Sequence, residues 1–260
     1  MEAQMATGHK LPDVNEIRFS APLGWLAGGL SDFQKVMGPA LVYGIGLAAI
    51  SAIFALGILF SGQASWLMVF AGGFIFIAPM IAMGLYEAGR QLEQGKTASL
   101  NEMLFVKTAS ARNLAYLGLA LLVVYFFWTR MAQLIYALST FTLHETVPEF
   151  LTFMVATPEG HAMAMTGTVV GALIGVIAFS LVVVSAPMLL DQKSDVFIAT
   201  VTSVRTVAKN PAPMLLWAAI IAALTALGIA TAFLGLIIVF PVIGLASWRA
   251  YRELVASPSD

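Results

Sequence analysis

One ionisable side chain, Arg130, lies well inside an apolar stretch, Asn113–Leu138. At 1.5 Å per helical residue it would lie ~25 Å from the start of that stretch, near the far side of a membrane. Inserting an arginine costs at least ~2.5 kcal/mol, so Arg130 is a candidate functional residue. It could pair with a carboxylate of the next loop, or bind an anionic lipid or a quinone-like headgroup. Alternatively, it could reach outer headgroups beside Trp128 and Tyr136 as an interfacial anchor. The loop carboxylates are Glu145, Glu149 and Glu159.

Imidazole and thioether groups lie in and just after the segment Ser139–Ala164. They are His144, His161, Met163 and Met165. Such ligands suit Cu(I), so a copper site on this side of the membrane is one hypothesis. The alternative is that the methionines pack against the neighbouring helices. The chain has no cysteine, which excludes thiolate metal sites, and no further metal ligands are expected.

Asp191 and Asp195 stand where the fourth predicted span ends. An aspartate at a helix start can cap the first amides, and this is one expectation for both residues. The other is a docking point for a partner. Further along the chain, Arg249, Arg252 and the Glu87/Arg90 pair are expected to lie at solvated helix ends, with charges paired at i,i+3.

Gly167, Gly171 and Gly175 recur every four residues in the fourth predicted span. Glycine lets helix backbones approach closely, and close packing drives helix association in lipid. This face is therefore a candidate packing surface, either inside the protein or against another subunit. The fifth span has a similar small-residue face, formed by Ala219, Ala222, Ala223 and Ala226.

Several motifs of common chemistries are absent from the sequence. It contains no GxxxxGK[ST], GxSxG or HExxH motif, so the usual parts of ATP-driven transport, serine hydrolysis and zinc proteolysis are missing. No enzyme activity and no cofactor are expected. The formal net charge of −1 gives no reason to expect a nucleic acid as a partner.

The composition indicates a membrane protein. The chain of 260 residues is 60% hydrophobic and 10% charged, whereas a soluble domain carries about 25% charged residues. Six stretches are apolar enough to span a bilayer as helices. They are Pro39–Phe60, Trp66–Tyr86, Asn113–Leu138, Met165–Leu190, Pro211–Ala230 and Thr231–Trp248. The predicted fold is therefore all-α, a bundle of about six transmembrane helices.

Lysine and arginine cluster on one side of these spans. They precede the first span, follow the sixth, and lie between the second and third spans and between the fourth and fifth. The segments Ser61–Ser65 and Ser139–Ala164 contain none. By the positive-inside rule, both termini are expected in the cytoplasm. Residues 1–21 lack the apolar core of a signal peptide and are expected to form a polar cytoplasmic tail.

The sequence also suggests three helical-hairpin repeats within one membrane domain, residues 22–257. Their expected boundaries are about 22–98, 99–190 and 191–257. Each would begin with an amphipathic stretch in the headgroup plane and end with a return span that carries a proline near its end. The apolar stripes are Leu26, Leu30, Phe33 and Met37; Leu100, Met103, Leu104 and Ala111; and Phe197, Val201, Val204 and Ala208. The prolines are Pro79, Pro187 and Pro241.

The chain resembles a bacterial family of integral membrane proteins, domain of unknown function 2189. The matching stretches are Pro22–Leu26 with Gly29 and Asp32, Gly84–Glu87, Trp128–Met131, Thr157–Gly160, Ser185–Asp195 and Thr202–Pro211. The resemblance implies a fold of about six spans in a bacterial inner membrane and implies no chemistry. Some members carry an oxidase-subunit-like label. A haem-copper catalytic subunit needs several histidines in its spans, and none of the predicted spans here contains one.

Three functional hypotheses follow. The first is a non-catalytic accessory or assembly component of a membrane complex, plausibly respiratory, whose partners are lipids and other membrane subunits. The second is a small-solute transporter or channel, for which polar groups within the spans are sparse. The third is a copper-handling protein that uses the outer loop.

Overall fold

Helices dominate the computed structural model, which describes residues 11–256 and confirms the all-α class. Between these residues the only β-pairing is an isolated antiparallel bridge between Val14 and Val255. The helices are α1 (Ala21–Lys35), α2 (Met37–Phe60), α3 (Trp66–Ile81), α4 (Met83–Glu93), α5 (Leu100–Leu104), α6 (Ala111–Ser139), α7 (Val147–Ala156), α8 (Pro158–Val182), α9 (Ser185–Asp191), α10 (Val196–Lys209), α11 (Pro211–Ala230) and α12 (Leu236–Leu254).

Five helical stretches of the described chain are long and apolar enough to cross a membrane. They are Met37–Phe60, Trp66–Glu93, Ala111–Ser139, Pro158–Asp191 and Pro211–Ala230. Between 17% and 39% of the residues in their apolar windows are buried, so apolar side chains cover much of the outer surface. Such an apolar outer surface is poorly solvated by water. It agrees with the prediction of a membrane protein.

The sixth predicted span, Thr231–Trp248, differs from the other five. The turn after α11 lasts until Gly235, and α12 carries Arg249, Arg252 and Glu253 in its last turns. These charges keep it out of the set of candidate spans. Most of α12 is also buried by its neighbours rather than exposed. The structure thus supports five spans, and α12 is a central helix of the bundle.

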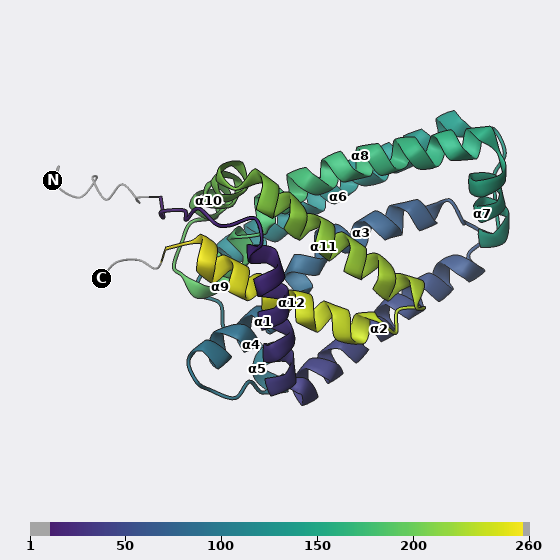
Figure 1. Cartoon of the computed structure of the whole chain (residues 1–260). Helices are drawn as coiled ribbons and strands as arrows, with labels where there is room; N and C mark the ends of the chain where they lie inside the picture. The colour runs from purple at the N-terminus through teal and green to yellow at the C-terminus, as the bar shows by residue number, and fades with distance from the viewer. Residues whose placement is uncertain (1–10, 257–260) are drawn as a thin grey trace.

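The largest apolar core lies at one end of the molecule, which we call the base. The base contains α1, α4, α5, α9, α10 and the last turns of α12, and α7 lies at the opposite end (Figure 1). Representative core side chains are Trp25, Leu85, Leu189, Trp217, Leu245 and Leu254. Two smaller clusters join α3, α6, α7 and α8 towards the α7 end. The outer half of α2 buries little beyond Ile58.

Two of the three predicted return spans are broken where they reach the base. The first breaks at Ala82, between α3 and α4, and the second at Val183–Val184, between α8 and α9. Pro79 precedes its break and Pro187 follows its break, whereas Pro241 lies inside the continuous α12. The shared prolines therefore do not mark the same local geometry.

A side chain from another helix satisfies a backbone group freed at each break. At the first break, the Tyr43 hydroxyl of α2 donates a hydrogen bond to the Ile81 carbonyl. At the second, the Ser203 hydroxyl of α10 accepts a hydrogen bond from the Val184 N–H (3.1 Å). Because buried backbone groups need partners, these contacts make the breaks compatible with a packed interior.

Replacing Ser203 by alanine should lower the free energy of unfolding by about 1–3 kcal/mol, because the buried Val184 N–H would lose its partner. The measurement is denaturant unfolding of the purified protein in detergent. Ser180→Ala is the control, since that exposed hydroxyl donates only to a carbonyl of its own helix. Equal effects of the two substitutions would contradict this role of Ser203.

The amphipathic stretches differ in how well they match expectation. In α1 the side facing α12 includes Trp25 and Phe33, whereas Leu30 stays exposed, as does Met37 at the start of α2. In α10 the buried residues are mainly small and polar, and Phe197 is 72% exposed. The second stretch begins at the predicted capping box, Ser99 with Glu102, but α5 ends at Leu104. It is shorter than expected because Phe105 leaves the helical conformation.

The segment before α1 is joined to the end of α12. Besides the Val14–Val255 bridge, Asn15 N–H donates to the Leu254 carbonyl (2.9 Å) and Ile17 N–H donates to the Asn210 side chain (3.0 Å). The predicted tail spanned residues 1–21, of which 1–10 lie outside the described residues. Its later part belongs to the base.

Candidate functional site

The last turns of α12 gather the polar side chains of the base. Trp248 and Arg252 contact Glu93 of α4, Arg249 contacts Asp32 of α1, and Tyr251 contacts Asp191 of α9. Glu253 accepts a hydrogen bond from the Trp25 indole of α1 (2.7 Å). We call these contacts the α12 network. It links helices that are far apart in the sequence.

Asp32 and Arg249 form a two-point ion pair. The guanidinium Nε and Nη2 donate to the two carboxylate oxygens of Asp32 at 2.5 and 2.9 Å, and Lys35 contacts the same carboxylate at 2.9 Å. The Asp32 side chain is 7% exposed. Burial alone would raise its pKa, but the hydrogen bonds from Arg249 and Lys35 outweigh burial, and the pKa lies below its ordinary value.

The second half of the α12 network centres on Asp191. Its carboxylate accepts a hydrogen bond from the Tyr251 hydroxyl (2.9 Å) and lies 3.4 Å from Arg252 Nη1. Arg252 Nε also donates to Glu93 (3.0 Å), and the Gln192 amide donates to the Tyr251 oxygen (2.8 Å). Burial, followed by the negative charge of Asp191, raises the pKa of Tyr251. The phenol therefore stays protonated and acts as a donor at neutral pH.

The pH dependence of stability should follow the lowered pKa of Asp32. A carboxylate with a depressed pKa stabilises the folded state fully above its ordinary value of 3.8 and loses that contribution as the pH falls through the folded-state pKa. The stability difference between wild type and Asp32→Asn should stay constant from about pH 7 to about pH 5 and shrink only in stronger acid. Unfolding midpoints measured across this range test it, and a difference that disappears by about pH 5 would contradict it.

Glu87 of α4 has partners outside the α12 network. Arg90 Nη2 lies 2.7 Å from its carboxylate and the Gln91 amide donates to it (2.8 Å). The i,i+3 pair is present as predicted, but the expected solvated setting is wrong, because Glu87 is only 6% exposed. The cause is the break at Ala82, after which α4 packs between α5, α9 and α12 instead of continuing into water.

Arg130 lies on α6 towards the α7 end, away from the α12 network. Its Nη1 donates to the Gln133 side chain (3.2 Å), and no carboxylate of the described chain lies within 4.0 Å of it. The expected pairing with a loop glutamate is thus not formed here. Glu149 instead completes a capping box with Thr146 at the start of α7.

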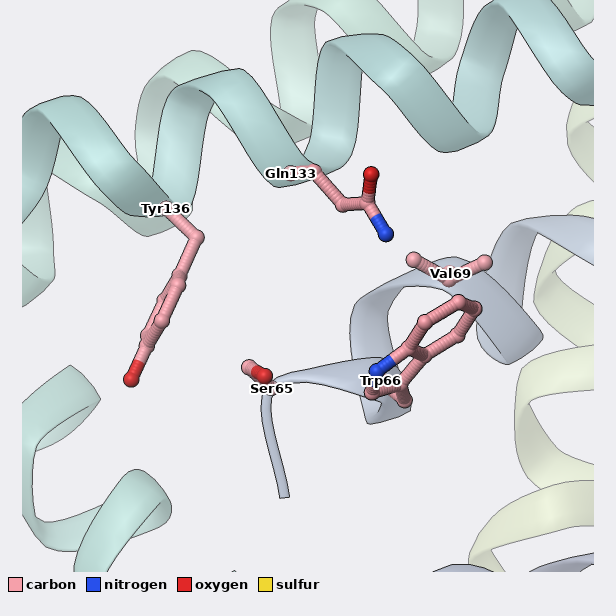
Figure 2. Close-up of a pocket in the computed structure, with 5 residues that line it drawn as sticks. All are labelled: Ser65, Trp66, Val69, Gln133 and Tyr136. Carbon is pink, nitrogen blue, oxygen red and sulfur yellow. The ribbon is translucent and has the colours of Figure 1, made fainter. Parts of the chain in front are cut away.

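A small pocket lies beside Gln133. It has a volume of about 70 Å³ and is lined by Ser65, Trp66, Val69, Gln133 and Tyr136. Figure 2 shows the Gln133 amide directed towards the first turn of α3, where Val69 and Trp66 lie. The pocket has room for one or two water molecules rather than for a larger solute.

The structure separates the two aspartates singled out in the sequence. Asp195 caps α10, because its side chain accepts a hydrogen bond from the Phe197 N–H (2.7 Å). Asp191 caps nothing and belongs to the α12 network.

The three glycines of α8 have different surroundings. A side chain at Gly167 would meet Met68 of α3, and one at Gly171 would meet Trp128 of α6. At Gly175 an added Cβ would have no atom within 4 Å. The first two glycines therefore let α8 pack closely against α3 and α6, whereas Gly175 faces open space on the surface of α8.

The candidate copper ligands have different partners and burial. His144 stacks on Phe153 and shares a hydrogen bond with Tyr136, and the His161 ring lies 2.8 Å from the Val155 carbonyl. Met163 is 1% exposed, whereas Met165 is 68% exposed. Within residues 11–256 no three His, Asp or Glu side chains form a group that could hold a metal ion.

The sequence reasoning missed the α12 network as a whole. It placed Arg249 and Arg252 at a charged helix end but did not predict their partners on other helices. One available signal was the density of aromatic and charged residues in Trp248–Glu253, since tryptophan and tyrosine with polar tips usually find partners when buried. The sequence reasoning also missed the residue at which α8 begins. Thr157 is its N-cap, and the Thr157 side chain accepts a hydrogen bond from the Gly160 N–H.

Comparison with known proteins gives one result. A model of the family described as "Predicted integral membrane protein (DUF2189)" matches residues 67–191. No curated protein and no solved structure matches the chain. The matched segment runs from α3 to the end of α9 and includes Glu93 and Asp191 of the α12 network, but not α12 itself.

Proposed function

We propose that this chain, which matches the model of the DUF2189 family of predicted integral membrane proteins over residues 67–191, is a non-catalytic accessory or assembly component of a membrane complex. In this proposal a rigid base holds the spans, and an exposed helix face in the membrane binds another subunit. A respiratory complex in a bacterial inner membrane is the setting that best fits the family resemblance.

The observation that carries the proposal is the outward face of α11. Its buried residues are Pro213, Met214, Trp217 and Gly228. Its small side chains lie on the exposed side instead: Ala219, Ala222, Ala223 and Ala226. Without large side chains, a helix of another subunit could approach the backbone closely, and dispersion contacts then favour association in lipid. Gly175 of α8 offers a second open position of this kind.

The same proposal includes the orientation in the membrane. The basic loops belong to the base, so the base faces the cytoplasm and α7 lies on the opposite side. The exposed apolar side chains of α1 and α10 would then lie in the headgroup plane, and α12 would return the chain to the cytoplasm as a short, protein-covered sixth passage. On this view the order of helices reflects three related hairpins.

Filling the α11 face should dissociate the complex without unfolding the protein. Ala222→Leu with Ala226→Leu should abolish co-purification of partner subunits after mild detergent extraction, because the larger side chains prevent close approach. The matched control, Ala115→Leu with Ala120→Leu, alters exposed alanines of α6 and should leave the complex intact. Native electrophoresis with mass spectrometry measures this. A protein that migrates alone in several mild detergents would contradict the proposal.

A small-solute transporter is the alternative proposal. It is supported by the polar pocket beside Gln133 and the neighbouring Arg130. This support is weaker, because a cavity of about 70 Å³ is too small for most solutes.

A further inference from the structure

Two segments of the base lie side by side and are joined by five hydrogen bonds. One segment connects α5 to α6, and the other connects α9 to α10. The Ser110 hydroxyl donates to the Gln192 carbonyl (3.1 Å) and accepts from the Ser194 N–H (3.0 Å). The Asn113 amide donates to the Ser194 carbonyl (2.9 Å), and Ala109 and Ser110 bond to the end of α9. We call residues 104–113 and 189–197 the base seam.

Three exposed basic residues lie on the base seam: Lys107, Arg112 and Lys193. Among the described residues, none of them has a carboxylate within 4.0 Å. The nearby acids are engaged elsewhere, Asp191 with α12 and Asp195 with the first amides of α10. The three cations of the seam are therefore in no direct ion pair, and they outnumber its two carboxylates, Asp191 and Asp195.

Large apolar side chains accompany these basic residues. Leu104, Phe105 and Phe197 are 58%, 73% and 72% exposed. Exposed aromatic rings near basic groups are typical of a membrane–water interface, where the ring meets acyl chains and the cation meets headgroups. A soluble anion such as free phosphate would gain nothing from these rings. The combination favours a ligand that has both a negative headgroup and an apolar body.

We propose that the base seam binds the headgroup of an anionic phospholipid of the leaflet that meets the base. Lys107, Arg112 and Lys193 bind the phosphate, and the acyl chains lie along the exposed apolar side of α6, where Tyr116 and Leu119 are 52% and 59% exposed. The five hydrogen bonds hold the two segments in place before the lipid binds, which lowers the ordering cost of binding. This site does not depend on the proposed function of α11.

The test is lipid binding to the purified full chain in neutral detergent. Lys107→Gln, Arg112→Gln and Lys193→Gln are combined in a seam variant. The control variant combines Arg18→Gln, Lys96→Gln and Arg205→Gln, which removes the same charge from exposed positions outside the seam. Native mass spectrometry and thermal unfolding are followed during titration with phosphatidylglycerol, phosphatidylcholine or inorganic phosphate.

Wild type should bind phosphatidylglycerol at least tenfold more tightly than phosphatidylcholine. At roughly fivefold per basic residue, the seam variant should lose about a hundredfold in affinity, and the control variant should stay close to wild type. Equal losses in both variants would overturn the proposal, as would equal binding of phosphatidylcholine. A stabilising shift reproduced by inorganic phosphate would assign the site to a soluble anion instead. If the seam variant unfolds, Lys193→Gln alone must show the roughly fivefold loss.

Discussion

Replacing Asp32 by alanine is expected to lower the free energy of unfolding by about 3 kcal/mol, one of the two largest effects that we predict. The substitution leaves the Arg249 guanidinium without its two carboxylate contacts of 2.5 and 2.9 Å. Removing one partner of a buried ion pair costs about 3–5 kcal/mol, and the 43% exposure of the Arg249 side chain places this pair at the lower end. Denaturant unfolding in detergent measures the loss.

Lys35→Ala is the matched control for Asp32→Ala, because Lys35 contacts the same carboxylate but its side chain is 55% exposed. It should cost less than about 1 kcal/mol. The double variant Asp32→Ala with Arg249→Ala should be less destabilised than the sum of the two single variants. Additive effects would show that the pair does not join α1 to α12 energetically.

Replacing Gly44 by leucine should displace α2 from α12 and cost about 3 kcal/mol, the other large effect. A Cβ at Gly44 would lie 2.2 Å from the Ile237 carbonyl oxygen of α12, so the backbones would have to separate. Gly46 is two residues further along the same helix, and a Cβ there would have no atom within 4 Å.

Gly46→Leu therefore serves as the matched control and should change the stability by less than about 0.5 kcal/mol. Thermal unfolding of both variants in the same detergent separates the two cases. If Gly44→Leu is as stable as Gly46→Leu, the close contact between α2 and α12 does not exist in the folded protein.

The sequence was sufficient to predict most of the membrane-spanning helices. Five of the six apolar stretches coincide with candidate spans, with ends displaced by a few residues. Hydropathy succeeds here because lipid accepts only helices that satisfy their own backbone groups. One large displacement is at α8, which begins at Pro158 rather than at Met165, because the Thr157 N-cap starts the helix within the outer loop.

The helix breaks and the α12 network could not be predicted in the same way. The breaks at Ala82 and Val183–Val184 depend on Tyr43 and Ser203, which come from other helices. Asp32 and Arg249 are separated by 217 positions in the sequence. Spacing along one helix reveals i,i+3 pairs such as Glu87 and Arg90, but it holds no information on which helix ends meet at the base.

Three residues were singled out in the sequence one at a time, and the structure gives each a different setting. Asp191 is part of the α12 network, and Asp195 is a helix cap, as one of the two expectations had it. Arg130 stands apart with Gln133. A lone charge in an apolar stretch indicates that a position is unusual, but its partners depend on neighbouring helices.

The most direct test of the account is cysteine labelling, which the absence of native cysteine makes clean. Thr142→Cys, Lys193→Cys and Ile53→Cys would be introduced singly and exposed to a water-soluble, membrane-impermeant maleimide in right-side-out and everted membrane vesicles. We predict that Thr142→Cys reacts only in right-side-out vesicles, that Lys193→Cys reacts only in everted vesicles, and that Ile53→Cys reacts in neither. Labelling of Lys193→Cys from the outside, or rapid labelling of Ile53→Cys, would contradict the account.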